Sequence, residues 1–184
     1  MRIVGGTSRG TALVAPPGEA TRPTTDRVRE TLFNILAHTH ADNLVGARVL
    51  DLFAGSGALG LEALSRGASF ALFVDEAGPA RAAIRRNIEA IGALGSTRVW
   101  RRSAISLGAS PVPPFHLVFL DPPYRKGLGE RALANAAAGG WLHPGALAIL
   151  EEAEDAAPDA VDGFEPVDTR RIGQTALTFW RFAG

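Results

Sequence analysis

The sequence predicts an α/β fold in which a parallel sheet carries helices on both faces. From residue 48 onward, short apolar runs typical of buried strands alternate with stretches whose apolar residues recur at helical spacing. This alternation indicates right-handed strand–helix–strand crossovers. The strands are expected at residues 48–53, 70–75, 98–100, 116–121 and 146–152, and the helices at 59–67, 79–92 and 128–140. At 184 residues the chain suits one domain, so we expect one active site.

The two ends of the chain add elements outside this rhythm. Two short β-prone pieces, Arg2–Val4 and Thr11–Ala15, flank a Gly/Ser/Arg loop and predict a hairpin. An amphipathic helix should follow, capped by Thr24, Thr25 or Asp26 and with Val28, Leu32, Ile35 and Leu36 on its apolar side. We therefore expect an N-terminal extension over residues 1–40 and the main domain over residues 41–184. Near the other end, residues 175–183 predict a last strand after an acidic loop, and an antiparallel direction would suit it.

Charge is balanced overall but unevenly distributed. The chain has 19 basic and 19 acidic side chains, so its net charge gives no case for strong non-specific attraction to polyanions. Six arginines and one acid lie between residues 81 and 103, whereas residues 151–168 contain eight acids and no base. One edge of the molecule is therefore expected to be positive and another negative.

Composition excludes several classes of function. The chain has no cysteine, which excludes disulfides, thiolate catalysis and cysteine-ligated metals. Its four histidines are scattered without ligand spacing, so no metal site is expected. No stretch is long and apolar enough to span a bilayer, and the first residues do not resemble a signal peptide. These features predict a soluble, cytoplasmic protein.

A glycine-rich turn marks a candidate nucleotide site. Gly55, Gly57 and Gly60 form a G-x-G-x-x-G pattern between a predicted strand and a predicted helix. Glycines let the chain turn sharply and let a ligand approach backbone amides at the helix N-terminus. Taken alone, the pattern is also compatible with a tight structural turn.

Two carboxylates sharpen the interpretation of this turn. Asp75 ends the second strand, where an acid can accept hydrogen bonds from ribose hydroxyls, and Glu76 is its rival for that role. Asp51 lies inside the first strand and would repel a pyrophosphate, but it suits the amino group of S-adenosylmethionine. The alternative is that Asp51 only accepts backbone N–H bonds within its own loop.

The stretch "DPPY", Asp121 to Tyr124, ends the predicted strand at 116–121 on the same rim of the sheet. An exocyclic amino group of a nucleobase is a poor nucleophile because its lone pair is delocalised into the ring. Asp121 and the Pro122 carbonyl offer two acceptors for its hydrogens, Pro123 restricts the backbone, and Tyr124 can stack on the base. The alternative is an ordinary proline turn with Tyr124 in the core.

Three blocks carry a resemblance to a known family: "RPTTDRVRETLFNIL" from Arg22, "DLFAGSGALGLEALSRGA" from Asp51 and "DPPYRKG" from Asp121. The chain resembles the bacterial 16S rRNA guanine-N2 methyltransferases of the D type, which are class I S-adenosylmethionine-dependent methyltransferases. The resemblance implies a Rossmann-like, seven-stranded mixed sheet that ends in an antiparallel hairpin. It also implies methylation of guanine 966 in conventional rRNA numbering, on naked 16S rRNA or within the small ribosomal subunit or an assembly intermediate.

The same resemblance implies roles for individual residues. The catalytic set would be Asp121, Pro122, Pro123 and Tyr124. The S-adenosylmethionine site would comprise Asp51, Phe53, Ala54, Gly55, Gly57, Asp75, Glu76, Ser103 and Ala104. Contacts to RNA, or a lid over the cofactor, would come from Arg22, Thr24, Asp26, Arg27 and Arg29, with a helix cap and solvated face as the alternative. Ser103 stands where related enzymes often have an acid that binds adenine, which leaves its role open.

Three rival functions use part of the same pattern. A DNA amino-methyltransferase normally needs a target-recognition domain, for which the chain has no spare length. A protein-glutamine methyltransferase usually has asparagine where this chain has Asp121. A nicotinamide-binding or nucleotide-sensing module would explain the glycines and leave Asp121 to Tyr124 without a role. If the substrate is rRNA, Arg2, Arg9, Arg27 and Arg29 are candidate phosphate contacts, with the arginines of residues 81–102 as a second option.

Overall fold

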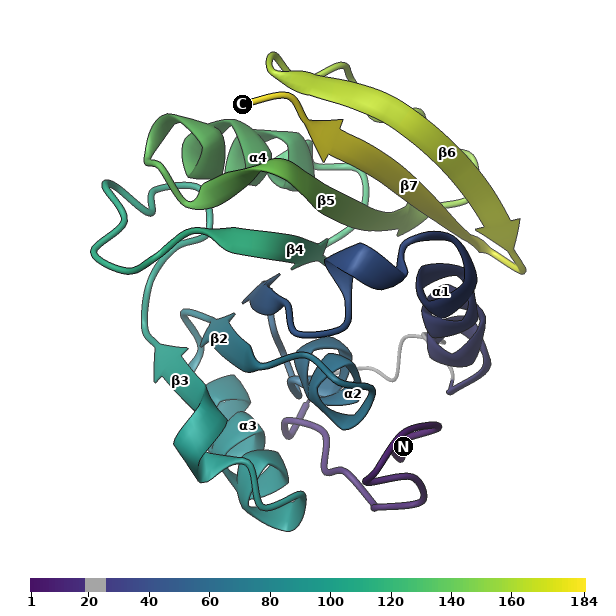
Figure 1. Ribbon diagram of the computed structural model, residues 1–184, viewed down its shortest axis with the longest axis vertical. Helices are drawn as coiled ribbons and strands as arrows, with labels where there is room; N and C mark the ends of the chain where they lie inside the picture. Colours follow the sequence, from purple (N-terminus) through teal and green to yellow (C-terminus); the bar gives the residue numbers. More distant parts are fainter. Residues whose placement is uncertain (19–25) are drawn as a thin grey trace.

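A computed structural model describes residues 1–18 and 26–184 of the chain. Its described residues form a seven-stranded sheet in the order β3-β2-β1-β4-β5-β7-β6, flanked by helices (Figure 1). The strands are β1 (Arg48–Leu52), β2 (Phe70–Val74), β3 (Thr97–Trp100), β4 (Phe115–Leu120), β5 (Leu142–Ala153), β6 (Phe164–Ile172) and β7 (Thr175–Phe182). The helices are α1 (Asp26–Thr39), α2 (Ala58–Ser65), α3 (Gly78–Ala90) and α4 (Leu128–Ala138), with short 3-10 turns at Ala41–Asn43 and Leu94–Ser96.

The direction of the strands confirms the predicted fold class. β1 pairs in parallel with β2 and β4, and the parallel pairing continues to β3 on one side and β5 on the other. β7 lies between β5 and β6 and runs antiparallel to both. The sheet is therefore mostly parallel with an antiparallel last strand, as the rhythm of the sequence and the family resemblance led us to expect.

One strand cannot be recognised from apolar periodicity. The acidic stretch expected as a loop extends only to the start of β6, which lies at the edge of the sheet. Most β6 side chains are exposed, including those of Glu165, Arg170 and Arg171. Charged side chains on an edge strand prevent further strand pairing. They also remove the apolar pattern by which the other strands are recognised.

The sheet has a buried core on each face. On one face, apolar side chains of α1, α2 and α3 pack against strand residues such as Val49, Phe73 and Phe119. On the other, Leu133 of α4 and Trp141 pack against strand residues that include Leu50. Since alternate residues of β1 point into different cores, both faces of the central strands are covered, which explains their continuous apolar runs.

The N-terminal segment folds as a narrow turn rather than a full hairpin. Arg2 and Ala12 form a single antiparallel bridge, and the amide of Ile3 donates to the Thr11 carbonyl at 3.0 Å. Ile3 and Leu13 are buried in the same core as α1 and the strands. The domain boundary expected at residue 40 stays a prediction.

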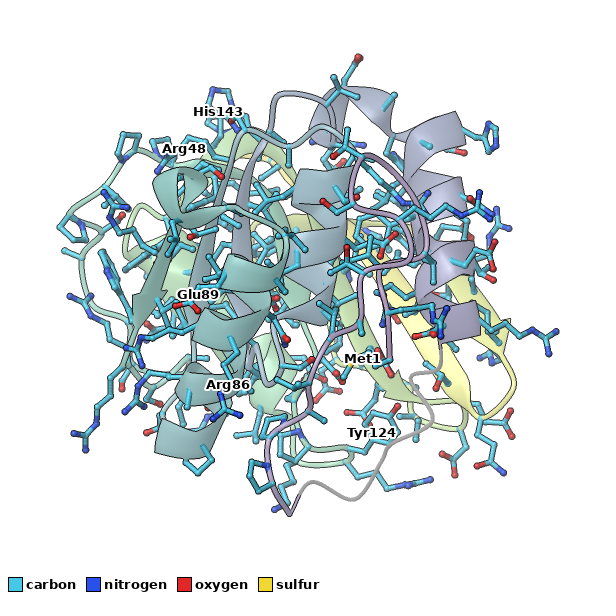
Figure 2. The ribbon with its side chains drawn as sticks, turned by 90° about the horizontal axis from the view of Figure 1, so that it is seen from below. Met1, Arg48, Arg86, Glu89, Tyr124 and His143 are labelled. Carbon is cyan, nitrogen blue, oxygen red and sulfur yellow. The ribbon has the colours of Figure 1, made fainter. Side chains whose placement is uncertain are left out.

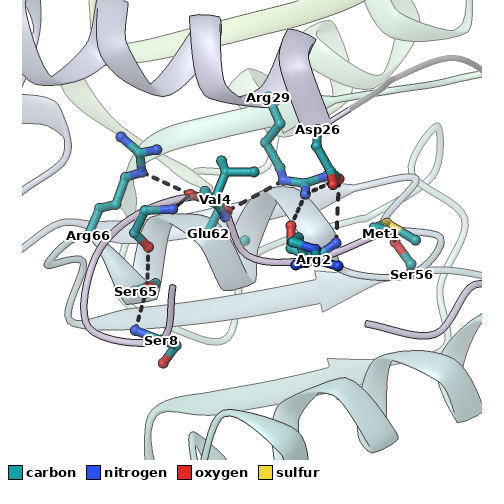
Figure 3. A network of polar contacts seen from close by, with 12 residues as sticks. Met1, Arg2, Val4, Ser8, Asp26, Arg29, Ser56, Glu62, Ser65 and Arg66 are labelled. Carbon is teal, nitrogen blue, oxygen red and sulfur yellow. Dashed lines mark hydrogen bonds and ion pairs between the residues drawn. The ribbon is translucent and has the colours of Figure 1, made fainter. Parts of the chain in front are cut away.

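A buried carboxylate ties this segment and α1 to α2 (Figure 3). Glu62 is 0% exposed and accepts hydrogen bonds from the amides of Val4 at 3.0 Å and Gly5 at 2.9 Å. The guanidinium groups of Arg29 and Arg66 lie on the same carboxylate, with Nε–O distances of 3.4 and 2.9 Å. A buried charge is tolerated when it is paired and hydrogen-bonded in this way. Glu62 thus joins three segments that are distant in sequence.

Within residues 1–18 and 26–184, no helix combines the length and apolar character needed to cross a membrane.

Replacing Glu62 with alanine should lower the free energy of unfolding by roughly 3–5 kcal/mol, because Arg29 and two amides would lose their buried acceptor. Chemical denaturation measures this loss. Glu89→Ala, which removes an exposed glutamate from α3, is the matched control and should leave stability nearly unchanged. Equal stability losses in the two variants would contradict a central role for Glu62.

Candidate active site

The chain leaves β1 through the glycine loop and enters α2, as the sequence predicts. Gly55 and Gly57 have φ angles of 59° and 78°, the left-handed region that glycine adopts without strain. Phe53 shares this region at φ 57°, which is uncommon for a residue with a side chain. A Cβ on Gly60 would lie 2.5 Å from the Phe73 ring, so only glycine lets α2 pack this closely on the sheet.

Asp51 lies beneath the glycine loop and is 1% exposed. Its Oδ2 accepts a hydrogen bond from the Gly60 amide at 3.0 Å. Burial raises the pKa of Asp51 to about 8, the Gly60 N–H opposes this rise, and the charge of Asp75 adds to it. This bond to the Gly60 amide is the one expected if Asp51 only accepts N–H bonds within its own loop. The other oxygen, Oδ1, takes no part in this bond, and Asp51 lines the pocket.

Asp75 directly follows β2 and contacts both the glycine loop and the residue that precedes α3. Its two carboxylate oxygens accept hydrogen bonds from the amides of Gly55 and Ala77, each at 2.9 Å. Glu76 follows on the exposed rim, and its carbonyl accepts a bond from Arg81 at 2.7 Å. Both acids line the pocket, so the structure leaves both as candidates for a ribose contact.

The residues after β4 approach the same pocket from the neighbouring strand. Asp121 and Pro123 line it, and Pro122 between them is buried. Tyr124 is partly buried and its hydroxyl donates to Glu151 Oε1 at 3.1 Å. Burial and, after it, the charge of Glu151 raise the pKa of Tyr124, so the phenol keeps its proton. Tyr124 is thus directed toward the end of β5.

These elements enclose one pocket of about 680 Å³ at the carboxyl ends of β1, β2 and β4. Figure 2 shows Met1 and Tyr124 at this side of the molecule, away from Arg48 and His143 at the opposite ends of the strands. Among the residues expected from the sequence, the pocket brings together Asp51, Phe53, Ala54, Gly55, Asp75, Glu76, Ala104, Asp121, Pro123 and Arg29. Its lining does not include Gly57, Ser103, Pro122 or Tyr124.

The N-terminal segment forms a wall that sequence reasoning missed. Met1 and Ala15 line the pocket, and the Ser56 hydroxyl lies 3.6 Å from the Met1 sulfur. Asn87 of α3 holds this wall in place. Its side chain exchanges two hydrogen bonds with the Val14 backbone, at 2.8 and 2.9 Å, and donates to the Ser56 carbonyl at 2.8 Å. The available signal was an asparagine on the otherwise apolar, buried side of a predicted helix.

The lid or RNA residues are only partly within the described structure. Arg22 and Thr24 lie outside the described residues. Arg27 is exposed on α1. Arg29 is 1% exposed and bound to Glu62, to the Arg2 carbonyl and to Asp26 at 2.8 Å, although it also lines the pocket. This placement suits a lid residue better than a phosphate contact, and both roles stay predictions.

The segment after β3 contributes one of its two expected residues to the pocket lining and adds an arginine. Ser103 is half-buried outside the pocket lining, whereas Ala104 and Arg102 line it. Arg102 is held over the Trp100 ring at 4.9 Å and donates to the Leu107 carbonyl at 3.0 Å. The side chain of Arg102, a cation, therefore lines the pocket in the region where the sequence predicts the Ser103 hydroxyl as an acceptor.

Comparison with known proteins agrees with this architecture. The family model described as Conserved hypothetical protein 95 matches residues 1–181. The ribosomal RNA small subunit methyltransferase D of Escherichia coli strain K12 is 40% identical over 182 residues, covering 98% of this chain and 89% of that protein. The protein of the same name from Haemophilus influenzae is 36% identical over 159 residues, covering 84% and 80% of the two chains.

A solved structure gives the same result in three dimensions. The structure of yhhF from Escherichia coli has a TM-score of 0.83 and 38% sequence identity, covering 100% of this chain and 99% of that chain. The chain therefore belongs to the Conserved hypothetical protein 95 family, and the resemblance to small-subunit rRNA methyltransferases of the D type that its motifs indicated is confirmed.

Proposed function

We propose that this protein transfers a methyl group from S-adenosylmethionine to the exocyclic N2 of a guanine in 16S rRNA. The carrying observation is that Asp51 and Asp121, at the ends of the adjacent strands β1 and β4, line the same pocket. One carboxylate suits an amino acid ammonium group and the other suits a nucleobase amine. The E. coli and H. influenzae relatives, named as small-subunit rRNA methyltransferases, support the substrate class, and the family resemblance points to guanine 966.

The chemistry of the pocket fits S-adenosylmethionine. Asp51 offers a carboxylate for the ammonium group of its methionine part, and the bare backbone at Gly55 admits close approach. Asp75 or Glu76 would accept from the ribose hydroxyls, and Phe53 and Ala104 offer apolar surface to the adenine. When bound, the cofactor supplies an electrophilic methyl group on its sulfonium sulfur.

The residues after β4 would prepare the nucleophile. The Asp121 carboxylate and the Pro122 carbonyl hold the two hydrogens of the guanine amine, which aims the nitrogen and raises its electron density. Pro122 and Pro123 restrict the backbone that carries these acceptors, and acceptors aimed in advance would need little reorganisation during the reaction. The amine becomes acidic as its new bond forms, so Asp121 receives the proton late or passes it to water. Positioning and charge placement account for the rate acceleration.

We expect exposed arginines to make the first contacts with RNA, through its phosphates. Arg85, Arg86, Arg98 and Arg101, on α3 and at β3, are exposed, and so are Arg2, Arg9 and Arg27. Phosphate contacts orient RNA without reading its sequence, and their strength falls with salt. This substrate class also implies action in the cytoplasm, on naked 16S rRNA or on a small-subunit particle.

The decisive experiment is nucleoside mass spectrometry of 16S rRNA from a strain that lacks this gene. Loss of one N2-methylguanosine, restored by the wild-type gene, is the expected result. Purified protein should then methylate the unmodified rRNA at that position. An unchanged nucleoside profile, or methylation of DNA or of a protein glutamine instead, would refute the proposal.

Substituting Asp121 with alanine should lower the rate of methyl transfer by about 100-fold to 1,000-fold, because one preorganised partner of the reacting group is lost. Cofactor affinity, measured by calorimetry, should stay nearly constant because Asp51 and Asp75 are intact. Asp162→Ala removes an exposed aspartate remote from these contacts and should keep normal activity. A large loss of cofactor binding in Asp121→Ala would argue against this role.

Cofactor affinity should increase with pH up to about 8, the raised pKa of Asp51. The ligand-free site holds a proton below this pH, and a bound ammonium group favours the ionised carboxylate, so binding releases the proton. The association constant should therefore rise by up to about tenfold per pH unit below the pKa. Calorimetry in buffers of different ionisation enthalpy measures both effects. Asp51→Asn should bind weakly and lose the pH dependence, and a flat wild-type profile would exclude this linkage.

A further inference from the structure

The phenol of Tyr124 is held by two side chains from the C-terminal part of the sheet. Its hydroxyl donates to Glu151 Oε1 at 3.1 Å and lies 3.4 Å from Thr175 Oγ1. Glu151 and Thr175 are each 3% exposed, whereas Tyr124 is partly exposed. We propose that Glu151 and Thr175 are positioning residues that orient the Tyr124 ring for the substrate base. This inference rests on the proposed function.

Strand register explains how these side chains meet. Leu120 of β4 pairs with Leu150 of β5, so Asp121, which directly follows β4, lies level with Glu151, two residues before the end of β5. On the other side of β5, Ala153 pairs with Thr175, the first residue of β7. The β6–β7 turn, with Gly173 at φ 59°, thus brings Thr175 to the rim that holds Asp121. The terminal strands thereby supply side chains at the edge of the candidate active site.

The chemistry of the contact favours a permanent anchor. A buried carboxylate requires a donor, and a hydrogen bond from a phenol to a carboxylate is charge-assisted, which makes it stronger than one between neutral groups. Burial and the nearby Glu151 charge raise the pKa of Tyr124, so the phenol remains a donor across the neutral range. The hydroxyl lies at the far end of the ring axis, so holding it restrains sideways displacement and tilting of the ring.

The next residue is fixed to the same strand end. The Arg125 amide donates to Glu152 Oε1 at 3.0 Å, and that oxygen also accepts from the Ala153 amide at 2.9 Å. Arg125 has a φ of 63°, a conformation that such external contacts can hold. Consecutive acids of β5 therefore hold Tyr124 by its side chain and Arg125 by its backbone.

An anchored ring has a kinetic consequence. The base amine must align with the methyl donor, and a displacement of about 1 Å can cost about 100-fold in rate. RNA affinity depends mainly on phosphate contacts, so a misplaced ring should affect kcat rather than KM. Mutants that lose the anchor should therefore have a lower kcat and a nearly unchanged KM for RNA.

The test compares four variants with a matched control. Tyr124→Phe keeps the ring and removes its hydroxyl, Glu151→Leu removes the acceptor, Glu151→Gln retains an acceptor oxygen, and Thr175→Val removes the second hydroxyl. Thr178→Val is the control, because Thr178 is a 7% exposed threonine of the same strand whose hydroxyl has no hydrogen-bond partner among the described residues. Steady-state methylation of 16S rRNA gives kcat and KM, and calorimetry gives cofactor affinity.

We expect kcat to fall by roughly tenfold to 100-fold in Tyr124→Phe and Glu151→Leu, less in Thr175→Val, and little in Glu151→Gln. KM for RNA and cofactor affinity should stay near wild type, and Thr178→Val should match wild type throughout. Normal kcat in Tyr124→Phe, or equal effects of the two threonine variants, would overturn the proposal.

A second measurement does not depend on the substrate. Tyr124 is the only tyrosine of the chain, so ring-labelled tyrosine gives a single NMR probe of the environment of this ring. Glu151→Leu should shift this signal because the ring is no longer held at its hydroxyl, whereas Glu151→Gln should resemble wild type. An unchanged signal in folded Glu151→Leu would refute the anchor. Lack of rRNA methylation by the wild type would instead refute the proposed function alone.

Discussion

The common alignment of the parallel strands is the constraint on which the site depends. β1, β2, β4 and β5 run in the same direction, so their carboxyl ends meet along one rim. Buried strands have no room for charges in their middle, and polar groups collect where they end. Asp75 and Asp121 directly follow their strands, Asp51 lies one residue before the end of β1, and Glu151 lies two residues before the end of β5. The chemistry of the pocket is therefore a consequence of the topology together with a few acids at strand ends.

Much of this arrangement is predictable from the sequence. The central strands are continuous apolar runs because both of their faces are covered, and the acids that end them are conspicuous. Glycines identify the loop because Gly60 has no space for a side chain and Gly55 and Gly57 have positive φ angles. Apolar runs and glycine spacing thus identify the central strands and the glycine loop, because both depend on residues that are close together in the sequence.

Other features depend on contacts between distant residues. The edge strand β6 has exposed charges and no apolar period, so its pairing with β7 is invisible locally. Asn87 meets Val14 across 73 positions, and Tyr124 meets Glu151 across 27. Periodicity contains no information about such pairs. The family resemblance supplied the terminal hairpin, but it did not indicate which side chains that hairpin brings to the rim.

The Asn87 contacts also have a thermodynamic meaning. One carboxamide joins the N-terminal wall at Val14 to the glycine loop at Ser56, and it has no spare donor once both bonds are made. Opening the wall and loosening the loop therefore break the same set of bonds, and the two segments belong to one cooperative unit of local unfolding. Any ligand that settles in the pocket will slow hydrogen exchange in residues 1–15 as well as in the loop, because it stabilises both together.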